Sequence, residues 1–325
     1  MITFSFDNRV WRVEFPSLNA DFKVEFNVSD IDRIVEHETT VSDKTVINKL
    51  LESVSSEGFL HPVLVTEHRG VYVIADGTHR LFALRELALK KDCRIHVPLN
   101  ILREPYFKRD SWVFYFNSRI NLERIMEDGF TATEVDSKDV EKASDLVISG
   151  KIQALIKTGG KIYTVHRKVD DRYSFLKSLK ELDNLLGDYN ELVLREMFTS
   201  KPGEMAFLAP PIDRKGDIEL LVENKNLRRR KASRTVVKLR PLFLDTPLQV
   251  LCEDYEDVKN FIMEKIENLI YNEKILLVKP PVTGLDFCND AFDHPLLVMN
   301  KDIFYSKNNL KKKLENQLLE EYKII

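Results

Sequence analysis

Residues 76–80 combine residue types that suit a charged ligand, and they lie where an apolar run ends and a helical pattern begins. In order, they are Asp76, Gly77, Thr78, His79 and Arg80. The preceding Val71–Ala75 predicts a strand, and the following Leu81–Leu87 predicts a helix. A tight turn between a strand and a helix directs backbone N–H groups and the positive end of the helix dipole towards one point. Such a turn is an anion site, best suited to phosphate.

Each residue type in this turn has a use at an anion site. Gly77 permits a sharp turn and the close approach of a phosphate. Thr78 and His79 begin the helix, where backbone N–H groups lack partners within the helix. Arg80 can bind phosphate oxygens through two donors. Asp76 can cap the helix, bind Mg²⁺ or assist a proton transfer. An ordinary helix capped by Asp76, with the histidine and arginine in solvent, fits these residues equally well.

A second motif places a histidine between two carboxylates, in the order Glu36, His37 and Glu38. It lies between the end of a predicted strand and a helix predicted to begin near residue 44. Phosphoryl transfer to a hydroxyl needs a group that orients the hydroxyl and accepts its proton. Glu38 can take that role, or it can hold a metal. By itself the motif is more typical of a solvated strand end.

Together, the two motifs resemble the ParB/sulfiredoxin superfamily, and within it the free L-serine kinases, including the kinase of a siderophore pathway. His37 and Glu38 match a His-Glu pair that follows the first strand of those kinases. Residues 76–80 match their Asp-Gly-x-His-Arg turn, and Pro98 lies on the following strand. The resemblance covers about residues 25–115, including the connection Glu104–Trp112.

The resemblance implies a reaction in which free serine receives the γ-phosphoryl group of ATP, or the β-phosphoryl group of ADP, and becomes O-phosphoserine. Glu38 matches the family's catalytic glutamate. Asp76 would help to place Mg²⁺ or the reacting groups. The nucleotide phosphates would be held by Gly77, Thr78, His79 and Arg80. Nucleotide and Mg²⁺ are therefore the expected cofactors.

Binding of the amino acid is expected to involve residues outside these two motifs. Related proteins carry a Pro-Pro-Lys-Thr-Thr-Arg-His-like segment, then Arg-Pro, and here Leu227–Thr235 and Arg240-Pro241 stand in those places. The paired prolines and the final histidine of that segment are absent. The candidate substrate-binding residues are Thr39, Trp112, Lys231, Ser233 and Arg234.

Residue identities separate the branches of the superfamily. Sulfiredoxins place a reactive cysteine where this chain has Thr78, whose hydroxyl lacks the nucleophilicity of a thiolate. Chromosome-partition ParB proteins carry Gly-Glu-Arg-Arg at the turn and a downstream helix-turn-helix, and neither pattern is found here. Some of the kinases have a second histidine at the position of Thr78, so the choice between ATP and ADP stays open. Two alternatives also stay open: a nucleotide-binding regulator without turnover, and a ParB-like DNA-associated protein.

Composition limits the remaining possibilities. The chain has 325 residues, 43% of them hydrophobic, and this length favours two globular domains. A formal net charge of −3 argues against a protein built to coat nucleic acid or an anionic membrane. Cys93, Cys252 and Cys288 lie far apart, which predicts reduced thiols in a cytoplasmic protein. We expect no signal peptide and no membrane-spanning helix. The oligomeric state is left open.

The predicted fold class is α/β (α+β). Residues 25–102 read as strand, helix, hairpin, helix and strand. With the resemblance, this predicts a ParB/sulfiredoxin-like catalytic domain with a mixed sheet over residues 1–118. Residues 119–325 are expected to form an accessory α+β domain that can close over the site. Within it, amphipathic patterns predict helices at Tyr173–Leu186 and Tyr255–Tyr271, and Thr158-Gly159-Gly160 predicts a hairpin turn.

Overall fold

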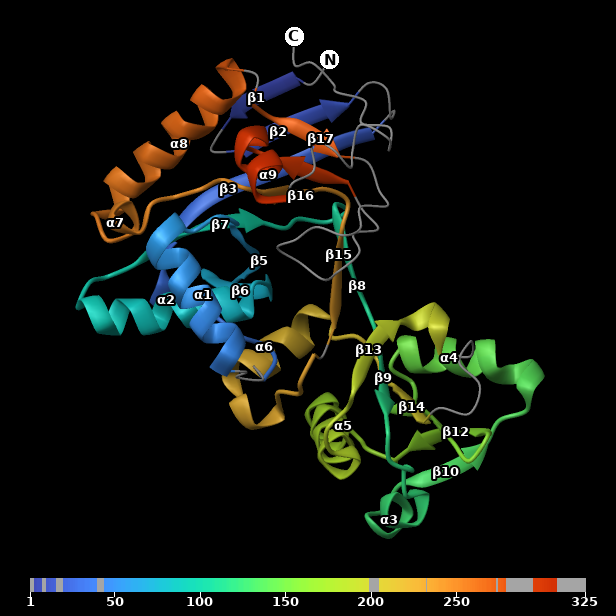
Figure 1. The fold of residues 1–325 in the computed structure, drawn as a ribbon. Helices are drawn as coiled ribbons and strands as arrows, with labels where there is room; N and C mark the ends of the chain where they lie inside the picture. The colour runs from blue at the N-terminus through green and yellow to red at the C-terminus, as the bar shows by residue number, and fades with distance from the viewer. Residues whose placement is uncertain are drawn as a thin grey trace. The chain divides into compact units, whose positions relative to one another are not determined.

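The computed structural model describes residues 3–7, 10–15, 20–39, 44–198, 205–231, 233–272, 274–278 and 295–308 (Figure 1). The chain divides into two compact units. The first unit comprises Met1–Glu36, Ser42–Phe107 and Val237–Ile325, and the second comprises His37–Val41 and Lys108–Val236. Both units contain helices and strands, so the predicted mixed α/β class is confirmed.

A seven-stranded sheet forms the centre of the first unit, in the order β1-β2-β3-β7-β5-β6-β4. Its strands are β1 (Thr3–Asp7), β2 (Val10–Phe15), β3 (Ala20–Asp30), β4 (Ile34–Val35), β5 (Val63–His68), β6 (Val71–Asp76) and β7 (His96–Ile101). The β5–β7 and β4–β6 pairs are parallel, and the other four pairs are antiparallel. The sheet is therefore mixed, as predicted.

Two helices of this unit follow the predicted pattern. Helix α1 spans Lys44–Glu57, and Gly58 follows it with a φ of +85°. The Gly58 N–H donates to the carbonyl of Val54, which is the predicted glycine end of the helix. Helix α2 spans Thr78–Lys91 and buries Leu81, Ala83, Leu84 and Leu87.

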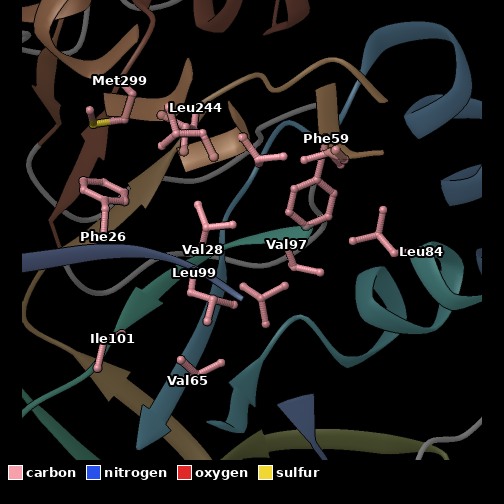
Figure 2. Close-up of a cluster of buried hydrophobic side chains, with 14 of the residues drawn as sticks. Phe26, Val28, Phe59, Val65, Leu84, Val97, Leu99, Ile101, Leu244 and Met299 are labelled. Carbon is pink, nitrogen blue, oxygen red and sulfur yellow. The ribbon is translucent and has the colours of Figure 1, made fainter. Parts of the chain in front are cut away.

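The C-terminal segment belongs to the first unit. Its elements are β16 (Arg240–Leu242), α7 (Leu248–Leu251), α8 (Tyr255–Tyr271), β17 (Leu276–Val278), β18 (Leu296–Val298) and α9 (Lys301–Asn308). The three strands form a small sheet in the order β16-β18-β17. Figure 2 shows Leu244 and Met299 of this segment together with Phe26 and Val28 of β3 in one buried cluster.

The division into units does not follow the predicted boundary at residue 118. Helix α8 buries Val258, Ile262, Ile266 and Leu269, and these side chains join the core that contains β3 and β7. Burying such a side chain contributes about 1.5–3 kcal/mol, so the segment is an integral part of this core. Periodicity indicates that α8 has a buried face, but it does not identify the surface against which that face packs.

One prediction from the cysteines is wrong. Cys93, two residues after α2, forms a disulfide with Cys252, which directly follows α7. The two Cα atoms are 5.8 Å apart, although 159 residues separate the cysteines in sequence. Spacing along the chain gave no sign of the pair because folding of the C-terminal segment onto the first unit brings the cysteines together. Cys288 lies outside the described residues.

The second unit is built on a six-stranded antiparallel sheet, in the order β10-β12-β11-β14-β9-β13. The strands are β9 (Trp112–Phe116), β10 (Thr131–Glu134), β11 (Ala154–Thr158), β12 (Lys161–His166), β13 (Glu191–Leu194) and β14 (Met205–Leu208). Its helices are α3 (Leu122–Glu127), α4 (Val140–Ile148), α5 (Arg172–Leu186) and α6 (Lys215–Glu223). The hairpin of β11 and β12 confirms the predicted Gly159-Gly160 turn.

Two short strands, β8 (Phe107–Asp110) and β15 (Arg234–Val237), pair with each other.

Within the described part of the chain, no helix has both the length and the apolar character that crossing a membrane requires.

Candidate active site

The turn at residues 76–80 has the predicted strand–turn–helix form. Asp76 is the last residue of β6, and Thr78 is the first residue of α2. Gly77 between them is the N-cap residue and has a φ of +102°, a backbone conformation that favours glycine. The Leu81 N–H donates to the Gly77 carbonyl at 2.9 Å and closes the first helical turn. Because Gly77 occupies the N-cap position, the alternative in which Asp76 is the N-cap does not hold.

Arg80 supports the turn from within the first unit. Its Nη1 donates to the carbonyls of His61 at 2.7 Å and Pro62 at 2.9 Å. Its Nη2 donates to Oδ2 of Asp76 at 3.2 Å. A Cβ atom on Gly77 would lie only 2.8 Å from this Nη2. The guanidinium therefore connects the turn to the segment before β5, and its predicted contact with phosphate stays a prediction.

A second arginine reaches the same carboxylate. Nη1 of Arg240, at the start of β16, donates to Oδ2 of Asp76. The Arg240 side chain is only 12% exposed, against 40% for Asp76. The sequence marked Arg240 as part of an Arg-Pro pair but gave it no role. No local signal distinguishes it among 49 lysines and arginines, because 164 residues separate it from Asp76.

His61 completes this cluster as a neutral side chain. Its pKa is lowered to about 3, first by burial and then by the positive charges of Arg80 and Arg240, while Asp76 opposes the shift. The Phe243 backbone N–H donates to Nδ1 of His61 at 3.1 Å, so the neutral ring carries its proton on Nε2. The side chains of Arg80, Arg240, Asp76 and His61 thus sum to one positive charge. With the N-terminus of α2, this charge favours an anion.

Thr78 and His79 lie in the first turn of α2, and both are half-buried. Their backbone N–H groups belong to the end of the helix that is predicted to bind phosphate. The whole predicted phosphate turn is thus carried by the first unit.

Glu38 lies in the second unit and is half-buried, between a buried His37 and an exposed Thr39. Nη1 of Arg109 is 2.9 Å from Nε2 of His37, and the Ser233 hydroxyl is 3.4 Å from the same atom. Because arginine can only donate, Nε2 must accept, and the neutral imidazole carries its proton on Nδ1. These contacts hold His37, the residue directly before Glu38, in place.

Thr39, the residue directly after Glu38, is also held by hydrogen bonds. Its backbone N–H donates to the carbonyl of Arg229 at 2.8 Å, and its hydroxyl donates to the carbonyl of Arg228 at 3.0 Å. The sequence predicted substrate contact for this hydroxyl, and the structure shows a hydrogen bond to the backbone. The segment at 228–230 thus fixes the backbone on one side of Glu38.

Two buried arginines interact electrostatically with Glu38. Burial lowers the pKa of Arg109 to about 10, while the charges of Glu38 and Asp213 oppose that shift. Burial also lowers the pKa of Arg229, against the charges of Asp183 and Glu38. These arginines give Glu38 a positive environment that the sequence did not reveal, because their burial depends on tertiary packing.

The other predicted substrate-binding residues also lie in the second unit. The Arg234 guanidinium lies 5.6 Å from the centre of the Trp112 ring, which fits a cation–π contact. Ser233 is buried beside His37. Lys231 is half-buried and has a positive φ of 45°. The structure thus pairs Trp112 with Arg234 and Ser233 with His37.

Asp76 is the predicted ligand of Mg²⁺. Among the described residues, no three histidine, cysteine, aspartate or glutamate side chains gather in a way that could hold a metal ion. Mg²⁺ commonly binds through one or two carboxylates together with substrate phosphates, which a single aspartate satisfies. The metal role of Asp76 stays a prediction.

A pocket of about 440 Å³ in the first unit lies elsewhere, along α8. It is lined by Phe261, Glu264, Lys265, Asn268, Leu269, Asn272, Lys274, Asn300 and Asp302. None of the predicted site residues lines it, so we place no catalytic role there.

Comparison with known proteins assigns the N-terminal part of the chain. The family model of the ParB N-terminal domain matches residues 18–100. This part of the chain therefore resembles a ParB N-terminal domain. This match covers β3 to β7 and includes the turn at residues 76–80.

Two curated relatives resemble most of the chain. It is 27% identical over 244 residues to an ATP-dependent L-serine kinase from Staphylothermus marinus, which covers 70% of this chain and 92% of the relative. It is 25% identical over 261 residues to the ATP-dependent L-serine kinase SbnI from Staphylococcus aureus, which covers 77% of this chain and 95% of the relative. The resemblance to the free serine kinase branch is thereby confirmed.

Solved structures share the fold. A free serine kinase in complex with AMP superposes with a TM-score of 0.50 at 21% identity, over 70% of this chain and 94% of the other. SbnI from Staphylococcus aureus with a C-terminal truncation superposes with a TM-score of 0.56 at 19% identity, over 75% and 96%.

Proposed function

We propose that the chain is a kinase that transfers a phosphoryl group from ATP to the hydroxyl of free L-serine, with ADP and O-phospho-L-serine as products. The two curated relatives, both named ATP-dependent L-serine kinases, support this activity. The structural observation that carries it is the glycine turn before α2, where two arginines and a helix N-terminus create a positive environment. Neither observation excludes ADP as a second phosphoryl donor.

The turn binds the nucleotide in this proposal. Backbone N–H groups of Gly77, Thr78 and His79 bind phosphate oxygens, and the positive cluster at Asp76 offsets their charge. Asp76 would hold Mg²⁺ together with phosphate oxygens, and the ion would neutralise charge on them. A solved free serine kinase variant contains ADP, which supports a nucleoside diphosphate as a ligand of such a fold.

Glu38 activates the serine hydroxyl, which receives the phosphoryl group. The serine Oγ attacks the γ-phosphorus, the bond from that phosphorus to the β,γ-bridging oxygen of ATP breaks, and Glu38 accepts the hydroxyl proton. His37 and Thr39 keep Glu38 in position, because both are anchored to other parts of the second unit. Trp112, Lys231, Ser233 and Arg234 are the proposed contacts for the remainder of the amino acid.

The full chain incubated with Mg-ATP and L-serine should yield O-phosphoserine, detected by ³¹P NMR. Glu38→Gln keeps the shape of the side chain but cannot accept the proton, so it should reduce turnover by ~10²-fold or more while sparing ATP binding. Glu36→Gln is the matched control. Its carboxylate pairs with Arg85 in the first unit, so turnover should stay close to wild type.

Other outcomes distinguish the alternatives. Near-normal turnover in Glu38→Gln would reject the role of Glu38. ATP binding without any product would favour a regulator over an enzyme. Salt-dependent DNA binding without nucleotide binding would favour a ParB-like DNA-associated protein.

A further inference from the structure

The carboxylate of Asp76 joins distant parts of the first unit. Asp76 is the last residue of β6, and its Oδ2 accepts hydrogen bonds from Arg80 of α2 and from Arg240 of β16. Arg80 also binds the carbonyls of His61 and Pro62. The C-terminal segment therefore contributes a charged group directly to the predicted phosphate turn.

Packing fixes the position of Arg240. Its backbone N–H donates to the carbonyl of Pro295 at 3.1 Å, and β16 pairs in parallel with β18. Leu239 before it and Leu242 after it are both buried. With its side chain only 12% exposed, Arg240 has few orientations other than the one that meets Asp76.

The charges at the turn show what Arg240 supplies. Arg80 and Arg240 contribute two positive charges, Asp76 one negative charge, and the neutral His61 none. Loss of Arg240 brings the sum from one positive charge to zero. It also leaves the Asp76 carboxylate with one fewer guanidinium, next to the N-terminus where a phosphate would lie.

We propose that Arg240 is a positioning residue of the nucleotide site, which acts by holding and partly neutralising the Asp76 carboxylate beside the phosphate turn. This inference rests on the proposed function, because it assumes that the turn binds a nucleotide. It makes the C-terminal segment part of the phosphate-binding apparatus.

The test is ADP binding to the full chain in the presence of Mg²⁺, measured by calorimetric titration. Arg240→Met should weaken ADP binding on the order of tenfold, because a charge-assisted hydrogen bond and a positive charge are lost. Arg240→Lys keeps the charge and should recover part of that loss. Arg103→Met is the matched control: Arg103 pairs with Glu25 and Glu67 in the same unit, so its loss should leave ADP affinity unchanged.

A double-mutant cycle separates positioning from direct ligand contact. If Arg240 acts through Asp76, the loss caused by Arg240→Met should shrink several-fold when Asp76→Asn is already present. A loss of equal size in both backgrounds would overturn the positioning role. Thermal unfolding of each variant identifies any that fail to fold, and Arg240→Lys provides the second readout in that case.

The possible failures are distinguishable. If the wild type binds ADP but makes no O-phosphoserine, the proposed function fails and the role of Arg240 is still decided by the cycle. If the wild type is active and Arg240→Met binds ADP normally, only the role of Arg240 fails. A wild type that binds no ADP would overturn both.

Discussion

Burial keeps the imidazole of His61 neutral, and this single residue sets a pH dependence for the first unit. In water a histidine has a pKa of about 6.5, whereas burial and two nearby arginines lower the pKa of His61 to about 3. Below about pH 6.5 the unfolded chain therefore gains a proton that the folded chain does not. The contribution of His61 to folding becomes less favourable as the pH falls.

We expect the free energy of unfolding to fall by about 1.4 kcal/mol per pH unit from this source between pH 6 and pH 4. His61→Asn removes the titrating group and keeps an oxygen that can accept from the Phe243 N–H. Urea unfolding at several pH values should give a shallower decline for the variant below pH 6. Parallel curves for the two proteins would show that His61 is not the source.

The residues that the sequence identified at the site are those that form local motifs. Asp76 to Arg80 and Glu38 are recognisable because a turn or a His-Glu pair is contiguous in the chain. Arg240 and Arg109 escaped because their partners are distant: 164 residues separate Arg240 from Asp76, and 72 separate Arg109 from His37. Which arginine is buried, and beside which carboxylate, is decided by tertiary packing.

At the scale of elements, the junction of β6 and α2 depends on one glycine. Gly77 has a φ of +102°, and a Cβ there would lie 2.8 Å from Nη2 of Arg80. An alanine would therefore strain the backbone and displace the guanidinium that supports the turn. Gly70, in the hairpin between β5 and β6, has a φ of +79°, but a Cβ added there would meet no atom within 4 Å, so it separates the two effects.

We expect Gly77→Ala and Gly70→Ala each to lower the free energy of unfolding by about 1–2 kcal/mol, the usual cost of a left-handed backbone for a residue with a Cβ. Only Gly77→Ala should also weaken ADP binding, because only there does Arg80 move. Calorimetric titration of both variants with ADP checks this. Equal ADP affinity in the two variants would contradict a role for the turn in phosphate binding.

Local patterns predicted these elements well but not their arrangement. The helix expected at about 79–90 is α2 at Thr78–Lys91, and the hairpin of β5 and β6 formed as expected. The order β3-β7-β5 was not predicted, because pairing of β3 with β7 joins residues far apart in sequence. Periodicity reveals which face of a strand is buried, while neighbours in a sheet are chosen by long-range packing.

At the scale of the whole molecule, the chain returns to the unit in which it began. Residues 237–325 contribute Leu244, Ile262, Leu297 and Met299 to the core around β3 and β7. An accessory domain over 119–325 was the simpler expectation, because the recognisable motifs end before residue 118 and no local pattern indicates the return. The disulfide between Cys93 and Cys252 links the C-terminal segment covalently to the N-terminal part of the first unit.

This disulfide should stabilise the first unit by restricting its unfolded state. It closes a loop with a sequence separation of 159 residues, and long loops lose the most entropy on cross-linking. Replacing both cysteines by serine should lower the free energy of unfolding by about 2–4 kcal/mol.

Thiol counting tests the bond independently of stability. The chain has three cysteines, and two of them form the disulfide, so the denatured, unreduced protein should react with one equivalent of a thiol reagent. After reduction it should react with three. Three reactive thiols without a reductant would show that the bond does not form. A stable bond whose loss left the unfolding free energy unchanged would instead mean that noncovalent contacts alone hold the C-terminal segment in place.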